Sequence, residues 1–304
     1  HKLSSDGKKK LKTQGSSRSL GINRTISIRL SENIQQKKKK EEAYEWSYES
    51  LNFTVLSTKI YKERGKSKVV KMAEKAVLVL IGLAVGFVSA LLAYLEEHAV
   101  HLKRSFTDSY LNGSSENLLK AWGFYSGISV ALVLIASSLT VLWAPGATGS
   151  GVAELIAFFN GVNYPKLLGL KTLFVKFVGV LFAVVGNLIV GKEGPLAHIG
   201  ANLGVYVTYL PIPGFDYFRN DFYKKQMLAI GTSAGVSAAF GAPVGGVLFA
   251  YEISKPNSFW KFSVLWKTFV ACAMAVFSLA IFRQLFEGKG LKDVRSAVLK
   301  FSGT

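Results

Sequence analysis

Residues 191–195 read Gly191-Lys192-Glu193-Gly194-Pro195 and open an otherwise apolar segment, since residues 194–213 contain no acid, Lys or Arg. A carboxylate at membrane depth is costly, so it is expected to be functional and to face a protein-lined or watery path. Glycine lets backbone approach a ligand closely, and proline suits the first turn of a helix. The stretch therefore predicts a helix N-terminus aimed at an anion, with Glu193 competing for the same place.

Two long apolar runs predict a membrane protein. Ala76–Leu95 spans 20 residues and Ala121–Ala144 spans 24, and each is long enough to cross a hydrocarbon core. The polar residues 1–70 offer no apolar region of a signal peptide. The fold class expected is all-α, in a multi-pass integral membrane protein, and both plasma membrane and endomembranes stay open as its location.

The net charge of +18 is unevenly distributed, because residues 1–70 hold 17 Lys or Arg against 7 Asp or Glu. A basic tail ahead of the first span favours a cytosolic N-terminus. The run Lys37–Lys40 is compatible with nucleic-acid binding, but next to membrane spans a solvated tail attracted to anionic lipid is the better interpretation. We therefore expect residues 1–70 to be largely disordered, with the bilayer and not nucleic acid as partner.

Metal and cofactor sites are not expected. The single cysteine, Cys272, lies in an apolar run and leaves neither a disulfide framework nor a metal cluster. His98 and His101 follow the first expected span, residues 74–97, and can share a helix face, but no third ligand is near, so an interfacial role is favoured. Asn112-Gly113-Ser114 forms a glycosylation sequon, a weak signal on the predicted non-cytosolic side.

The second part of the chain consists of short, interrupted apolar segments. Phe177–Val190 has only 14 residues, Pro243 divides Gln226–Tyr251, and Thr268–Phe282 is the last apolar run. Such a series indicates discontinuous helices whose ends meet inside the bilayer. Irregular backbone is tolerable there only where it lines a cavity or is buried in protein.

A second glycine-rich break complements the first. Gly149-Ser150-Gly151 offers backbone N–H groups and a hydroxyl just before a probable helix beginning near Val152. Together with residues 191–195, these donors could coordinate a dehydrated halide without a full positive charge, which keeps binding weak enough for release. The small residues between Gly231 and Gly246 are interpreted as a surface for close helix packing.

Three motifs resemble the CLC family of chloride channels and chloride/proton antiporters in order and spacing: Gly149-Ser-Gly-Val-Ala-Glu154, Gly191-Lys-Glu-Gly-Pro195 and Gly241-Ala-Pro-Val-Gly-Gly-Val-Leu-Phe-Ala-Tyr-Glu252. The resemblance covers roughly residues 48–285. It implies two inverted repeats of tilted, broken helices, assembled as a homodimer with one pathway per subunit. It divides this chain into the tail 1–70, a first repeat 71–285, and a loop 286–304 toward a second repeat that this chain does not contain.

The resemblance also implies roles for individual residues. Glu193 matches the gating glutamate, whose carboxylate occupies an anion site when closed and swings away when open. Ser150 matches the serine that donates to the central anion and goes with chloride preference. The chloride-binding and selectivity residues implied are Gly149, Ser150, Gly151, Gly191, Lys192, Glu193, Gly194 and Pro195.

Two positions depart from the family pattern. Ala153 replaces the usual proline, which pre-sets φ in a first helical turn. Ile253 stands where exchangers of the family carry a second glutamate that accepts the internal proton. Because isoleucine binds no proton, we expect a voltage-gated chloride channel, with a chloride/proton exchanger as the alternative.

Two further interpretations remain open. A half-length chain supplies only part of an anion site and could be a non-conducting fragment. A membrane enzyme with Glu193 as general base is a second rival, for which His198 and Asn202 are the only nearby polar candidates. His198 is expected to pack or to hydrogen-bond within its helix, so an enzyme is not the favoured prediction.

Overall fold

The computed structural model describes residues 68–111, 118–162, 164, 166–212, 215–254 and 262–288, all within one compact unit, Ser50–Thr304. Most of the tail, the sequon at Asn112 and most of the loop 286–304 lie outside the described residues, so the expectations for them stay predictions.

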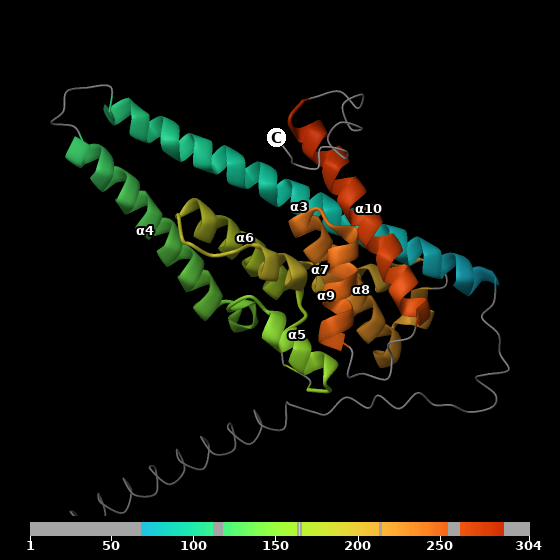
Figure 1. Ribbon diagram of the computed structural model, residues 1–304. Helices are drawn as coiled ribbons and strands as arrows, with labels where there is room; N and C mark the ends of the chain where they lie inside the picture. Colours follow the sequence, from blue (N-terminus) through green and yellow to red (C-terminus); the bar gives the residue numbers. More distant parts are fainter. Residues whose placement is uncertain are drawn as a thin grey trace, which may run out of the picture. The chain divides into compact units, whose positions relative to one another are not determined.

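The described residues form α-helices joined by short turns and two 3-10 helices (Figure 1). In order, the elements are α3 (Lys68–Leu111), α4 (Leu118–Leu142), η2 (Pro145–Ala147), α5 (Val152–Phe159), α6 (Leu170–Val185), α7 (Glu193–Thr208), η3 (Phe215–Phe218), α8 (Asp221–Phe240), α9 (Pro243–Ser254) and α10 (Phe262–Phe286). Helices α3, α4 and α10 are long and apolar enough to cross a membrane. The predicted all-α, multi-pass membrane fold is confirmed.

The helix that contains the first expected span is longer than that span. The expected helix 74–97 is the middle of α3, which runs for 44 residues without a break. Glu96 and Glu97 do not end it, because glutamate is a good helix former once the chain has left the hydrocarbon. At 1.5 Å per residue α3 is about 66 Å long, roughly twice the thickness of a hydrocarbon core.

The interrupted segments form the broken helices that were predicted. Helices α6 and α7 have 16 residues each, and an extended stretch joins them. Helix α8 ends at Phe240, its C-cap Gly241 has a φ of 65° that suits glycine, and Pro243 then opens α9. Short helices of this kind leave their ends inside the protein, where backbone groups can face a ligand.

Glycines bring α7 and α8 into backbone contact. A Cβ on Gly231 would lie 2.9 Å from the carbonyl carbon of Gly200 and 3.0 Å from Cα of Gly204. Gly235 is equally tight, with the Leu196 carbonyl carbon 2.9 Å from the Cβ position. The packing role predicted for the small residues after Gly231 is confirmed, and it fixes α7 at the centre of the fold.

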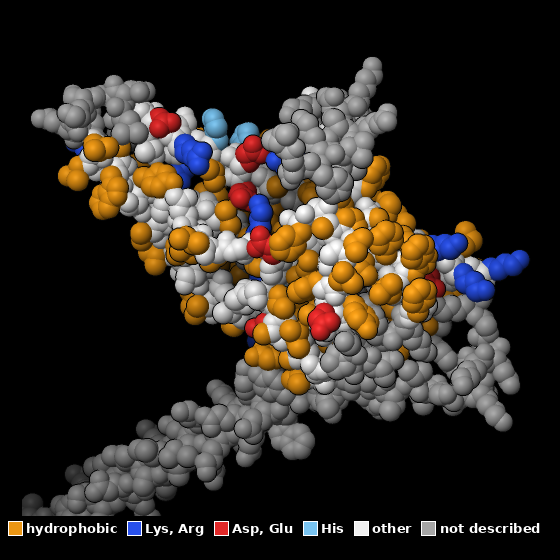
Figure 2. All heavy atoms as spheres, viewed as in Figure 1, with side chains coloured by type: hydrophobic (Ala, Val, Ile, Leu, Met, Phe, Trp, Pro, Cys, Tyr) orange, Lys and Arg blue, Asp and Glu red, His pale blue; other side chains and the backbone are white. Residues whose placement is uncertain are grey.

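A similar contact joins the long helices. A Cβ on Gly82 of α3 would lie 2.7 Å from the carbonyl oxygen of Ala271, and the Ser278 hydroxyl of α10 donates to the Leu83 carbonyl at 3.1 Å. Apolar side chains cover much of the visible described surface, while charged ones gather at few places (Figure 2). Exposed apolar residues include Val130 and Leu134 on α4 and Leu248 on α9, as expected for faces turned toward lipid or other helices.

Candidate functional site

The turn before α5 has a backbone conformation that favours glycine at two positions. Gly149 has φ 62° and Gly151 has φ 83°, both in the left-handed region. Gly151 caps α5, and its carbonyl accepts the first helical bond, from Leu155 N–H at 3.0 Å. Helix α5 thus begins at Val152 as predicted, with Ala153 in the place of the usual proline.

Residues 191–195 form the N-terminus of α7. Lys192 is the N-cap, Glu193 is the first helical residue, and Pro195 lies in the first turn as the sequence predicted. The Lys192 carbonyl accepts from Leu196 N–H at 2.9 Å. The Glu193 carboxylate folds back over Gly191, since a Cβ on that glycine would lie 3.3 Å from Glu193 Cδ.

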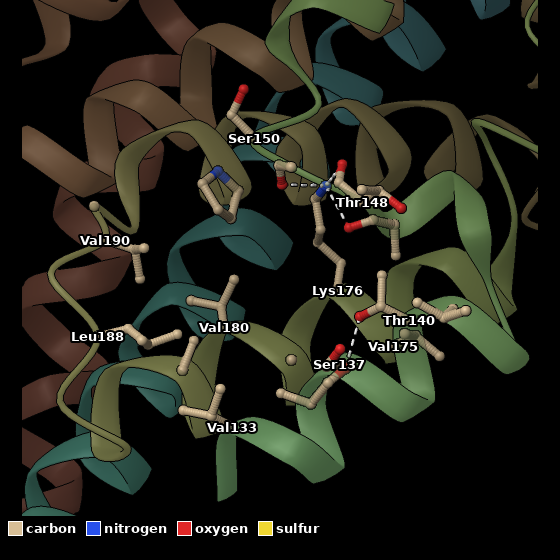
Figure 3. A pocket seen from close by; sticks show the side chains of 18 residues that line it. Val133, Ser137, Thr140, Thr148, Ser150, Val175, Lys176, Val180, Leu188 and Val190 are labelled. Atoms are coloured by element: carbon tan, nitrogen blue, oxygen red, sulfur yellow. Dashed lines mark hydrogen bonds between the residues drawn. The ribbon is translucent and has the colours of Figure 1, made fainter. Parts of the chain in front are cut away.

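The two breaks meet in space. A Cβ on Gly194 would lie 2.7 Å from the Cβ of Ser150. Both breaks also border one cavity of about 570 Å³ (Figure 3). It is lined by Val133, Ala136, Ser137, Thr140, Val141, Ala147, Thr148, Gly149, Ser150, Val175, Lys176, Gly179, Val180, Ala183, Leu188, Val190, Gly191 and Pro195.

Half of the predicted site residues line the cavity. Gly149, Ser150, Gly191 and Pro195 line it, whereas Gly151, Lys192, Glu193 and Gly194 do not. Its walls are mostly apolar side chains and backbone, with hydroxyl residues at Ser137, Thr140, Thr148 and Ser150. An apolar cavity with a few convergent donors suits a small, weakly hydrated anion.

Lysine 176 is the charged residue of the cavity wall, and the sequence analysis missed it. It lies inside α6 and is only 3% exposed. Its ammonium donates to the carbonyls of Ala147 at 3.0 Å, Thr148 at 3.3 Å and Gly149 at 3.0 Å (Figure 3). The sequence did offer a signal for Lys176, because a lysine just before the apolar run Phe177–Val190 is costly and is therefore expected to be functional.

The ammonium of Lys192 points elsewhere. It pairs with the Glu96 carboxylate of α3 at 2.9 Å, and the two side chains are 37% and 22% exposed. Lys192 was predicted as an anion-binding residue through its place in the motif. The ion pair holds its charge next to α3, and a part of Lys192 in anion binding stays a prediction.

His198 and Asn202 do not line the cavity. The His198 ring nitrogen Nε2 is 3.0 Å from the Leu167 carbonyl, outside its helix, and the imidazole is fully buried. Of the two arrangements expected for His198, the ring thus shows packing and not a hydrogen bond within its own helix. Its ring packs on Gly151, where an added Cβ would lie 2.6 Å from His198 Cγ. Asn202 makes the bond within the helix, donating to the His198 carbonyl at 3.0 Å, and accepts from Gly169 N–H at 3.1 Å.

Ile253 lies near the end of α9, half-buried against the cluster that contains Leu155 and Leu228. The preceding Glu252 is exposed, and neither residue lines the cavity. An apolar side chain is therefore well accommodated at this position.

Comparison with known proteins places this arrangement in a family. The family model described as voltage gated chloride channel matches residues 132–300, more than half of the chain. This chain belongs to the CLC family. It is 33% identical to human H(+)/Cl(-) exchange transporter 7 over 262 residues, 33% identical to chloride channel protein A of Dictyostelium discoideum, and 34% identical to chloride channel protein CLC-c of Arabidopsis thaliana.

The CLC chain spans about a third of the length of these relatives. The alignments cover 79%, 84% and 79% of it and 32%, 30% and 32% of the three proteins. Among solved structures, a slow cyanobacterial Cl-/H+ antiporter superposes with a TM-score of 0.60 at 21% identity, covering 69% of this chain and 47% of that one. A eukaryotic CLC transporter gives 0.57 at 24%, covering 71% and 39%. These superpositions show that the fold is that of the CLC proteins.

Proposed function

We propose that this chain provides the first half of a chloride pathway in a voltage-gated chloride channel. The observation that carries the proposal is the contact between Ser150 and Gly194, which brings the N-termini of α5 and α7 to the border of one cavity. Helix N-termini present free N–H groups and the positive end of the helix dipole, and both favour an anion. Ser150 is the proposed donor for selectivity.

Glu193 is the proposed gate. Its carboxylate stands at the first position of α7, where it receives the same electrostatic stabilisation as a bound anion would. The carboxylate and a chloride ion would then compete for the same position at the start of α7. Moving the side chain off Gly191 would open the path, and protonation would help by removing the charge that the helix terminus holds.

A channel is proposed over an exchanger because of Ile253. A proton-coupled cycle needs a group that accepts the proton from the internal side, and isoleucine has none. The named relatives include both an exchange transporter and chloride channel proteins, so similarity alone does not choose between the two modes of transport. The proposed assembly is a homodimer in the bilayer with one pathway per subunit.

Flux measurements on the protein with its full natural sequence test the proposal. Reconstituted into liposomes with a chloride gradient, it should move chloride without stoichiometric proton movement. Coupled proton movement would favour the exchanger. Absence of any chloride flux from folded protein would favour the non-conducting alternative.

A further inference from the structure

The ammonium of Lys176 donates hydrogen bonds to a single stretch of backbone. A buried ammonium is costly unless it is paired or fully hydrogen-bonded. Lys176 meets this requirement with three successive carbonyls, those of Ala147, Thr148 and Gly149, at 3.0–3.3 Å. Glu154, in the first turn of α5, is the acid whose charge acts on it, but no ion pair of Lys176 occurs among the described residues.

This arrangement fixes the direction of the peptide groups in the loop. The C=O and N–H of a trans peptide point in opposite directions, and no cis peptide occurs in the described residues. Because three carbonyls point to Lys176, the amides of Thr148, Gly149 and Ser150 point away from it. Thr148 N–H donates to the Pro145 carbonyl at 3.1 Å.

The two following amides remain available to a ligand. Within the described part of the chain, no hydrogen bond uses the N–H of Gly149 or of Ser150. Both residues line the cavity, and so does Lys176. Successive free N–H groups next to a left-handed glycine form a concavity of the type that binds anions.

We propose that Lys176 is the positioning residue of the anion site: it holds the carbonyls of residues 147–149 away from the chloride path and so keeps the amides of Gly149 and Ser150 turned toward it. The inference rests on the proposed function of the cavity. Without the ammonium, the three carbonyls would lose their donor, and rotation of their peptides would present oxygen atoms to the anion.

Lysine 103 supplies a matched control. It is 5% exposed, and its ammonium donates to the Ser129 hydroxyl at 2.6 Å and to the Val185 carbonyl at 2.9 Å. It therefore also satisfies backbone from a buried position, but it does not line the cavity. Replacing either lysine by methionine removes a buried charge, whereas only Lys176→Met releases the loop.

The test is the thiocyanate-to-chloride permeability ratio of the full-length protein, taken from the reversal potential under bi-ionic conditions. This ratio does not depend on how much protein reaches the membrane, and it can be read for a channel or an exchanger. Lys176→Met should change the ratio about tenfold in favour of thiocyanate, equivalent to about 1.4 kcal/mol. Lys176→Arg, which keeps charge and several donors, should stay within about twofold of the wild type, as should Lys103→Met.

The outcomes separate this inference from the function on which it rests. A wild-type ratio in Lys176→Met, or an equal change in Lys103→Met, would overturn the positioning role while leaving the anion pathway intact. Absence of anion current in the wild type would overturn both. If Lys176→Met fails to reach the surface, Lys176→Gln serves instead. Glutamine has only two N–H donors, so at least one of the three carbonyls loses its partner. A wild-type ratio in that variant contradicts the proposal.

Discussion

Ser150 contacts Gly194 so closely that a Cβ on the glycine would lie 2.7 Å from the Cβ of the serine. The contact joins the turn before α5 to the first turn of α7. A side chain at Gly194 would therefore disturb the turn that contains Ser150 as well. The two motifs act as one structural unit at the border of the cavity.

The first prediction follows from this contact. Gly194→Ala should reduce chloride current by at least about tenfold, because the methyl group must push the Ser150 loop away from α7. Gly127→Ala is the matched control, since a Cβ there meets nothing within 4 Å. Patch-clamp currents normalised to surface protein measure the effect, and equal currents in the two variants would contradict the proposed unit.

The second prediction concerns the ion pair of Glu96 and Lys192. It is partly exposed, so its coupling should be modest, about 1 kcal/mol or less. Glu96→Gln and Lys192→Gln should each shift the voltage of half-maximal opening, because each leaves one charge unpaired beside the gate. The double variant should shift it by less than the sum of the two single shifts. Strict additivity would show that the pair does not act on gating.

The third prediction concerns the glycine contact between α7 and α8. Gly231→Ala should destabilise the protein by about 3 kcal/mol or more, since its Cβ meets the carbonyl group of Gly200 and neither helix backbone can easily retreat. Gly123→Ala on α4 is the control, because that position is open. The thermal unfolding temperature in detergent measures the difference, and equal temperatures would refute the tight contact.

The sequence predicted the parts of this fold that depend on local chemistry. The start of α7 at the Gly191–Pro195 motif, the turn before α5 and the break between α8 and α9 all follow from glycine and proline. The helix that contains the expected span 74–97 continues to Leu111, because a charged pair can mark the end of a hydrocarbon span without ending the helix. The resemblance of three motifs to the CLC family supplied the arrangement that periodicity could not.

Long-range contacts were beyond prediction from the sequence. The pair of Lys192 and Glu96 joins residues 96 positions apart, and no local pattern indicates such a partner. Lys176 lies among apolar residues of α6, and its three acceptors become visible only when the turn before α5 folds back on α6. The partner of the His198 ring, the Leu167 carbonyl, lies 31 positions away and is hidden from the sequence for the same reason.

The central claim is that the Glu193 carboxylate closes an anion pathway. The most direct measurement compares chloride currents of the full-length protein before and after Glu193→Gln, which keeps the size of the side chain and removes its charge. The account predicts that the variant loses most of its voltage dependence and conducts over the whole voltage range. Currents with unchanged voltage dependence in Glu193→Gln would contradict it.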